Sequence, residues 1–175
     1  MFQIKQPAYG IDTQGFFKPN GELRNQGVEL NVFGEPLAGV RLLGGVMLLD
    51  SEQTKTAQGL TDGKRGTGAP VANVNLGAEW DIPRLQGLTL TARAIHTGAQ
   101  YLDAANQQRI DNWERYDLGA RYSFKVKENP VTLRATVENV LNTTYWASAA
   151  TSSDSAPGLT LSTPRTWLVS ATVGF

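Results

Sequence analysis

The sequence contains no cysteine, which excludes disulfide bonds, thiolate chemistry and zinc-thiolate sites. His96 is the only histidine, so neither a multi-histidine metal site nor a set of partners for a histidine-based triad is present. The 16 Lys and Arg residues balance the 16 Asp and Glu residues, so net charge gives no argument for a nucleic-acid partner. We therefore expect no enzyme: no catalytic residues, no metal site and no cofactor.

Long apolar runs are also missing. No stretch approaches the ~20 apolar residues of a membrane helix, and no segment shows the 3.6-residue apolar period of an amphipathic helix. Residues 1–6 lack the basic start and apolar stretch of a signal peptide. The sequence is instead rich in Gly, with 18, and in Thr, Val and Asn, which favours strands and turns. Any membrane interpretation must rest on alternation.

Alternation is clear in residues 165–175. Every second side chain is apolar, and the row begins and ends with an aromatic residue: Trp167, Val169, Ala171, Val173 and Phe175. A segment of about eleven residues with this pattern fits a transmembrane β-strand. It also fits a half-buried strand of a soluble sandwich, and this segment alone leaves both open.

Seven more segments alternate in the same way: residues 2–8, 22–34, 40–54, 73–82, 88–94, 115–126 and 131–138. In the last four of these segments, from residue 73 onwards, charges fall on one face only, while aromatics lie near the ends of the apolar face. This combination favours a lipid-facing band opposite a polar lumen. The expected lumen-facing ions are Arg93, Arg115, Asp117, Arg121, Arg134 and Glu138. They could form cross-strand pairs and contacts to a plug, or line a substrate path.

The connections alternate in length. Residues 35–39, 83–87 and 127–130 are short turns with Pro or Gly, whereas residues 9–21, 55–71, 101–112 and 143–163 are long and polar. Short turns on one rim and long loops on the other are typical of outer-membrane barrels. The pattern predicts an all-β, antiparallel, up-and-down barrel section of about eight strands.

Four segments carry a family resemblance. Residues 21–30 (GELRNQGVEL) resemble the "GE-x-R-x-x-G-x-E" strand of TonB-dependent outer-membrane receptors. Asp62 to Arg65, with Pro70, are similar to the loop that re-enters the barrel in the ferric-siderophore branch of this family. Residues 138–146 (ENVLNTTYW) resemble its "x-N-[LV]-[FL]-[ND]-x-x-Y" segment, and residues 164–175 resemble its C-terminal signature.

The resemblance implies a 22-stranded outer-membrane barrel, filled by an N-terminal plug, that takes up ferric siderophores with energy from TonB. The implied partners are a ferric siderophore, outer-membrane lipid, the barrel-assembly machinery that reads Phe175, and TonB only through the plug. Residues 1–175 resemble the C-terminal part of such a barrel, without plug, earlier strands or signal peptide. By itself this incomplete stave would be inactive in energised transport.

For ligand contact the resemblance points to long-loop aromatics: Tyr101, Trp113, Tyr145 and Trp146. Anchoring at the membrane interface is the competing role for each of them, and for His96 it is the expected role. The sequence leaves two other interpretations open: a complete eight-stranded barrel with an anchoring role, and a soluble β-rich binding module. The first strand is about half the necessary length for closure against the last, so we expect exposed sheet edges.

Overall fold

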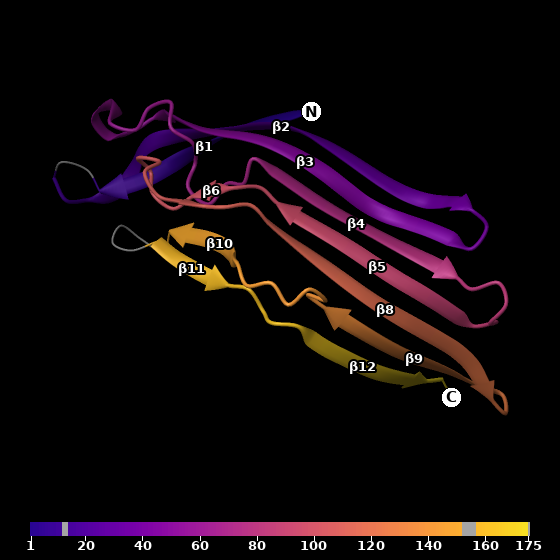
Figure 1. The fold of residues 1–175 in the computed structure, drawn as a ribbon. Helices are drawn as coiled ribbons and strands as arrows, with labels where there is room; N and C mark the ends of the chain where they lie inside the picture. The colour runs from indigo at the N-terminus through magenta and orange to yellow at the C-terminus, as the bar shows by residue number, and fades with distance from the viewer. Residues whose placement is uncertain (12–13, 152–156, 175) are drawn as a thin grey trace.

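A single antiparallel sheet of eight strands dominates the computed structural model, which describes residues 1–11, 14–151 and 157–174 (Figure 1). The strand order is β1-β2-β3-β4-β5-β8-β9-β12. The strands are β1 Phe2–Ile11, β2 Phe17–Leu37, β3 Val40–Lys55, β4 Ala72–Asp81, β5 Leu88–Thr97, β8 Trp113–Val126, β9 Asn129–Glu138 and β12 Thr166–Val173. Each strand of this sheet pairs with the strand of the same sheet that follows it along the chain, which confirms the predicted up-and-down topology. The sheet is open, because β1 and β12 lie at opposite ends of this order.

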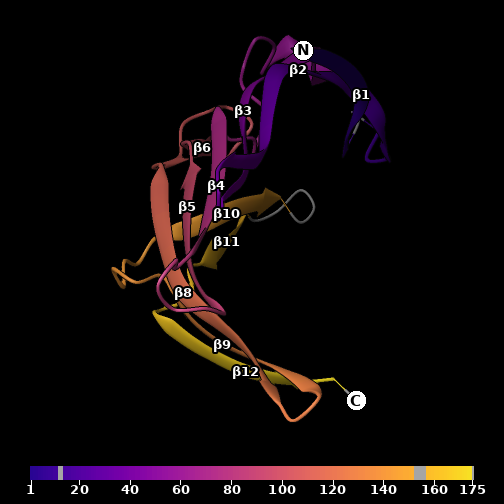
Figure 2. The same cartoon turned by 90° about the vertical axis from the view of Figure 1, so that its right-hand side faces the viewer.

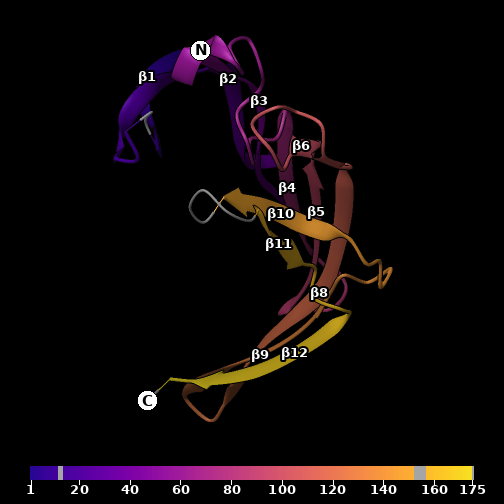
Figure 3. The same ribbon diagram turned by 90° about the vertical axis from the view of Figure 1, so that its left-hand side faces the viewer.

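The sheet bends into an arc, as Figures 2 and 3 show. Two short hairpins belong to the long loops: β6 Gln100–Tyr101 with β7 Arg109–Ile110, and β10 Trp146–Thr151 with β11 Pro157–Leu161. The β10–β11 hairpin lies on the concave side of the arc (Figures 2 and 3). A 3-10 turn at Ala57–Gly59 completes the elements, and none of the described helical residues forms a helix able to cross a membrane.

The two rims differ as the sequence predicts. Strands β2–β3, β4–β5 and β8–β9 are joined by short turns at one end, and the long loops gather at the other (Figure 1). Gly87 in the β4–β5 turn has φ +85, and an added Cβ there would collide with the carbonyl oxygen of Ser123. Glycine at this position therefore lets the turn approach β8, where the Ser123 amide donates to the Gly87 carbonyl at 2.9 Å.

Register aligns the apolar side chains of neighbouring strands on one face. Leu30 pairs with Val46, and Val46 in turn pairs with Val74. On the other half of the sheet, Val137 of β9 lies between Leu118 of β8 and Trp167 of β12. Because the described residues form no second layer over this face, its side chains stay accessible, up to 81% for Val169. An apolar face of this extent is typical of a membrane or partner surface.

The part of the chain that the structure describes has almost no conventional core. Among the described residues the only buried hydrophobic side chains are Leu102, Ile110 and Ala149, and all three belong to the long-loop region. A soluble sandwich buries the inner faces of two sheets against each other. The described residues form one principal layer, so this arrangement contradicts the soluble-module alternative.

Strand β1 is longer than the expected residues 2–8, since it ends at Ile11 and its ten residues reach the length that we expected it to lack. Its register also differs from the expectation. Phe2 pairs with Gly27 and Ile4 with Asn25, so these apolar residues lie on the polar face of the sheet. The strand runs from Gly27 towards the long-loop rim and ends opposite Phe17. Figure 1 shows its start midway along the sheet. Phe2 and Ile4 are therefore not part of the apolar band, which begins at Val28 on β2.

Candidate functional site: the ionic face and the loop cluster

The ionic face of the sheet is its concave face. The indole Nε1 of Trp113 donates at 3.1 Å to the carbonyl of Ala147, which belongs to β10 of the hairpin that lies inside the arc (Figures 2 and 3). Trp113 shares its face of β8 with every second residue after it, including Arg115 and Asp117. The apolar band consequently covers the convex side.

A four-residue ionic network lies on this face towards the short-turn rim. Arg41 Nη1 is 2.7 Å from Asp81 Oδ2, and Arg41 Nη2 is 3.1 Å from Glu79 Oε2. Arg121 Nη2 reaches the same Glu79 oxygen at 3.2 Å, and Thr89 Oγ1 donates to Asp81 Oδ1 at 2.6 Å. The network joins β3, β4, β5 and β8. Arg41 was not among the candidates, because β3 mixes apolar residues on both faces.

All six predicted lumen-facing ions lie on the concave face, but not in one cluster. Arg93 lies opposite Asp117, which is 5% exposed and accepts from Arg115 at 2.9 Å. Arg93 itself donates to Asn75 Oδ1 at 2.8 Å. Arg134 faces Arg121 across the β8–β9 ladder. Neither Arg134 nor Glu138 forms an ion pair with the residues that the structure describes.

Asn139 ties the end of β9 to the last long loop. It is fully buried, and its backbone amide donates to Asp117 Oδ1 at 2.9 Å. Its side-chain Nδ2 donates to the carbonyls of Thr143 and Thr163, both at 2.9 Å, while Oδ1 accepts from the Thr143 amide at 3.1 Å. The "N-V-L-N" segment of the sequence is therefore a clamp that holds both ends of the β10–β11 loop against the wall.

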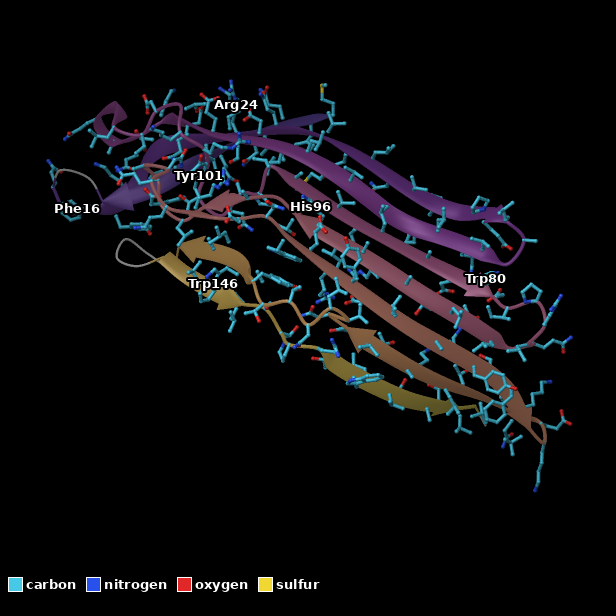
Figure 4. All side chains as sticks on the ribbon, viewed as in Figure 1. Phe16, Arg24, Trp80, His96, Tyr101 and Trp146 are labelled. Carbon is cyan, nitrogen blue, oxygen red and sulfur yellow. The ribbon has the colours of Figure 1, made fainter. Side chains whose placement is uncertain are left out.

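The structure brings two of the four candidate aromatics together. The rings of Trp113 and Tyr145 stack with centroids 4.4 Å apart and an interplanar angle of 13°. Burial is the main cause that raises the pKa of the Tyr145 phenol. Tyr101 lies in β6 and Trp146 begins β10, and neither ring stacks on another among the described residues (Figure 4).

The long loops pack against each other as one cluster. Asn106 holds the backbone of Arg65, accepting from its amide at 2.7 Å and donating to its carbonyl at 3.1 Å. Arg65 also forms an antiparallel bridge with Glu52 of β3. The loop of Asp62 to Arg65, which carries the family resemblance, therefore returns to the sheet. Backbone amides of Gln108 and Gln107 donate to Asp103, and they lower the pKa of its carboxyl. Sequence alternation gave no signal for these contacts.

The remaining candidates lie apart from this cluster. His96 is on the convex side near the long-loop rim, with Nδ1 3.4 Å from Glu114 Oε1 (Figure 4). No group of three or more potential metal ligands occurs among the described residues. Phe175 lies outside the described residues, and the preceding Gly174 donates its amide to the Pro130 carbonyl at 2.9 Å.

An open, curved sheet with an apolar convex face, an ionic concave face and loops on one rim defines the wall of a transmembrane β-barrel. Residues 3–140 match the family described as "TonB dependent receptor-like, beta-barrel", and the chain belongs to this family.

The relatives are siderophore receptors. The chain is 38% identical, over all of its length, to the ferrichrome receptor FcuA of Yersinia enterocolitica, of which it covers 23%. The structure of BauA, the ferric preacinetobactin receptor from Acinetobacter baumannii, shares 37% identity and a TM-score of 0.87, covering 99% of this chain and 26% of BauA. The siderophore receptor PiuA from the same organism has a similar fold, with a TM-score of 0.80 at 24% identity over 98% of this chain and 25% of PiuA. The chain thus spans about a quarter of the length of these relatives.

Proposed function

We propose that residues 1–175 form the C-terminal part of the barrel wall of an outer-membrane receptor for ferric-siderophore uptake. The observation that carries the proposal is the two-faced open sheet, which aligns over almost its whole length with a quarter of a siderophore receptor. Transport would need the plug and the other strands, so the section is inactive in energised uptake by itself. A complete small barrel is disfavoured because the sheet is not closed.

Each part of the section has a proposed role. The convex apolar band contacts outer-membrane lipid, the concave ions face the lumen, and the stacked Trp113 and Tyr145 contact the siderophore together with Tyr101 and Trp146. Aromatic rings offer flat apolar surface with polar edges, which suits iron-loaded chelates. Phe175 serves as the signal for the barrel-assembly machinery.

A chimeric receptor tests the proposal. The segment of the Yersinia ferrichrome receptor that aligns with this chain is replaced by residues 1–175, and the chimera is expressed in cells that lack their own receptor. We expect a heat-modifiable barrel in the outer membrane and growth on a ferric siderophore as sole iron source. Assembly of a normal barrel that supports growth on none of a panel of ferric siderophores would contradict the proposed function.

A further inference from the structure

Ala147 forms a β-bulge in the β10–β11 hairpin. Trp146 pairs with Leu161. The next pair joins Ser148 to Thr160, so two residues of β10 advance against one residue of β11 and the ladder is interrupted at Ala147. Bulges are common next to functional sites, because they change the direction of the side chains beside them. The large side chain beside this bulge is that of Trp146.

Trp113 holds the bulge from the wall of the arc. Its indole Nε1 donates to the carbonyl of Ala147 at 3.1 Å, and its ring stacks on Tyr145 with centroids 4.4 Å apart. Tyr145 is also tied to the other side of the hairpin, since its carbonyl accepts from the Ser162 amide at 2.9 Å. One side chain of β8 therefore contacts the residues on both sides of Trp146.

Trp146 is directed away from this wall. Successive side chains of an extended chain point to opposite sides, and Tyr145 already faces Trp113. The Trp146 side chain therefore turns towards the interior of the arc, where the hairpin lies (Figures 2 and 3). Trp146 is 46% accessible, and no other ring of the described residues stacks on it. Its indole face can therefore take a planar group of a ligand.

We propose that Trp113 is a positioning residue, which orients Trp146 through its hydrogen bond to the Ala147 bulge, and that the Trp146 ring stacks on a planar group of the ferric siderophore. The inference rests on the proposed function and deepens it, because it assigns different roles to two of the four candidate aromatics. The indole N–H of Trp113 acts on the ligand through Trp146. The chemical class that fits Trp146 is an aromatic or otherwise planar part of the chelate.

The rest of the hairpin is fixed independently of the indole N–H. Asn139 clamps both ends of the loop, and the buried Ala149 donates its amide to Gln100 Oε1 at 3.5 Å. Loss of the N–H should therefore loosen the bulge without unfolding the loop. Trp113→Phe makes this change, since phenylalanine keeps an aromatic ring against Tyr145 and lacks the donor.

A spin label at residue 146 tests the positioning without any siderophore. Trp146→Cys is labelled as the single cysteine of the chimeric receptor, and the nitroxide spectrum is recorded with and without Trp113→Phe. We expect narrower lines, from a more mobile label, in the Trp113→Phe variant. Trp80→Phe makes the same change on the convex face and is the matched control, which should leave the spectrum unchanged. An unchanged spectrum in Trp113→Phe, or an equal change in the control, would overturn the inference.

Ligand affinity tests whether the N–H acts through Trp146. Kd is measured by retention of the ferric siderophore that supports growth of the chimera, loaded with radioactive iron. Trp146→Ala should raise Kd about tenfold and Trp113→Phe about fivefold. The double variant should bind like Trp146→Ala alone, because the two residues act as one unit. Independent effects, which would multiply to about fiftyfold in the double variant, would contradict the positioning role.

Failure of the inference and failure of the proposed function give different results. A chimera that grows on no ferric siderophore contradicts the proposed function, whatever the spin label shows. A chimera that binds its siderophore with the same Kd before and after Trp113→Phe leaves the proposed function standing and overturns the inference.

Discussion

Asn139 shows how a single residue fixes the position of a loop. Its φ of +51 lies in the left-handed region, which Asn tolerates better than most residues, and its side chain satisfies groups from Thr143 and Thr163. The sequence segment identified this residue as part of a motif. Its mechanical role could not be predicted, because the partners are backbone groups that carry no side-chain signature.

Replacing Asn139 should loosen the last loop. Asn139→Gly keeps the backbone conformation but removes the side-chain hydrogen bonds, and we expect a loss of about 2–3 kcal/mol in the free energy of unfolding. Asn139→Ala should cost about 1 kcal/mol more, because alanine disfavours positive φ. Urea unfolding of the chimeric receptor in detergent measures both, with the exposed Thr144→Ala as the control. Equal stability of all three variants would contradict the clamp.

The stacked Trp113 and Tyr145 give a ligand-binding prediction at the same scale. Tyr145→Ala removes the ring and should raise the Kd of the chimera for its ferric siderophore about tenfold, equivalent to about 1.4 kcal/mol. Tyr145→Phe keeps the stack and should change Kd less than threefold. Tryptophan fluorescence quenching on titration with the loaded siderophore measures the affinity. If Ala and Phe variants bind alike, the ring does not contact the ligand.

At the scale of elements, the sequence predicts a strand where the two faces of that strand differ in polarity. All eight strands of the main sheet were predicted, since apolar and charged side chains alternate along most of them. The β10–β11 hairpin was missed because β10 consists largely of Ala, Ser and Thr, which show no contrast between faces. The first five residues of β2 were also missed, because Lys18, Pro19 and Asn20 interrupt the alternation.

The two faces of β5 should differ in how well they tolerate an introduced arginine. Ala92 lies between Ala78 and Leu118 in the apolar band, whereas its neighbour Thr91 faces the concave side beside Glu79. We expect Ala92→Arg to destabilise the membrane-inserted chimera by about 2–4 kcal/mol, and Thr91→Arg to have a small effect. Unfolding in lipid vesicles by guanidinium compares the two. A larger loss for Thr91→Arg would mean that the faces are assigned in reverse.

At the scale of the whole molecule, the open sheet explains why the section has so little core. The barrel interior and the bilayer supply the environments that a second protein layer supplies in a soluble domain. Alternation and loop lengths predicted this architecture. The register of β1 was not predictable, because Phe2 and Ile4 read as apolar on either face and only pairing with Gly27 and Asn25 distinguishes the two.

In the isolated section, the strands at the edges of the sheet should exchange their amide hydrogens faster than the central strands. In detergent, we expect amides in β4 and β5 to be protected from hydrogen exchange at least tenfold more than those of residues 28–37 and β12, since only the former lie between two partner strands. Mass-spectrometric exchange provides the comparison, with the chimera as the matched control in which the edges become protected. Uniform protection in the isolated section would indicate closure into a small barrel.

Lipid exposure along β9 shows whether the sheet is the wall of a membrane barrel. Single cysteines are placed at residues 131–137 of the chimeric receptor in vesicles, spin-labelled, and probed for collisions with oxygen dissolved in lipid and with a water-soluble nickel chelate. We expect accessibility to alternate with a period of two, with oxygen access highest at Leu133 and Ala135 and nickel access highest at Thr132, Arg134 and Thr136. Accessibility that does not alternate, or alternates in the opposite phase, would contradict the assignment of this sheet as a barrel wall.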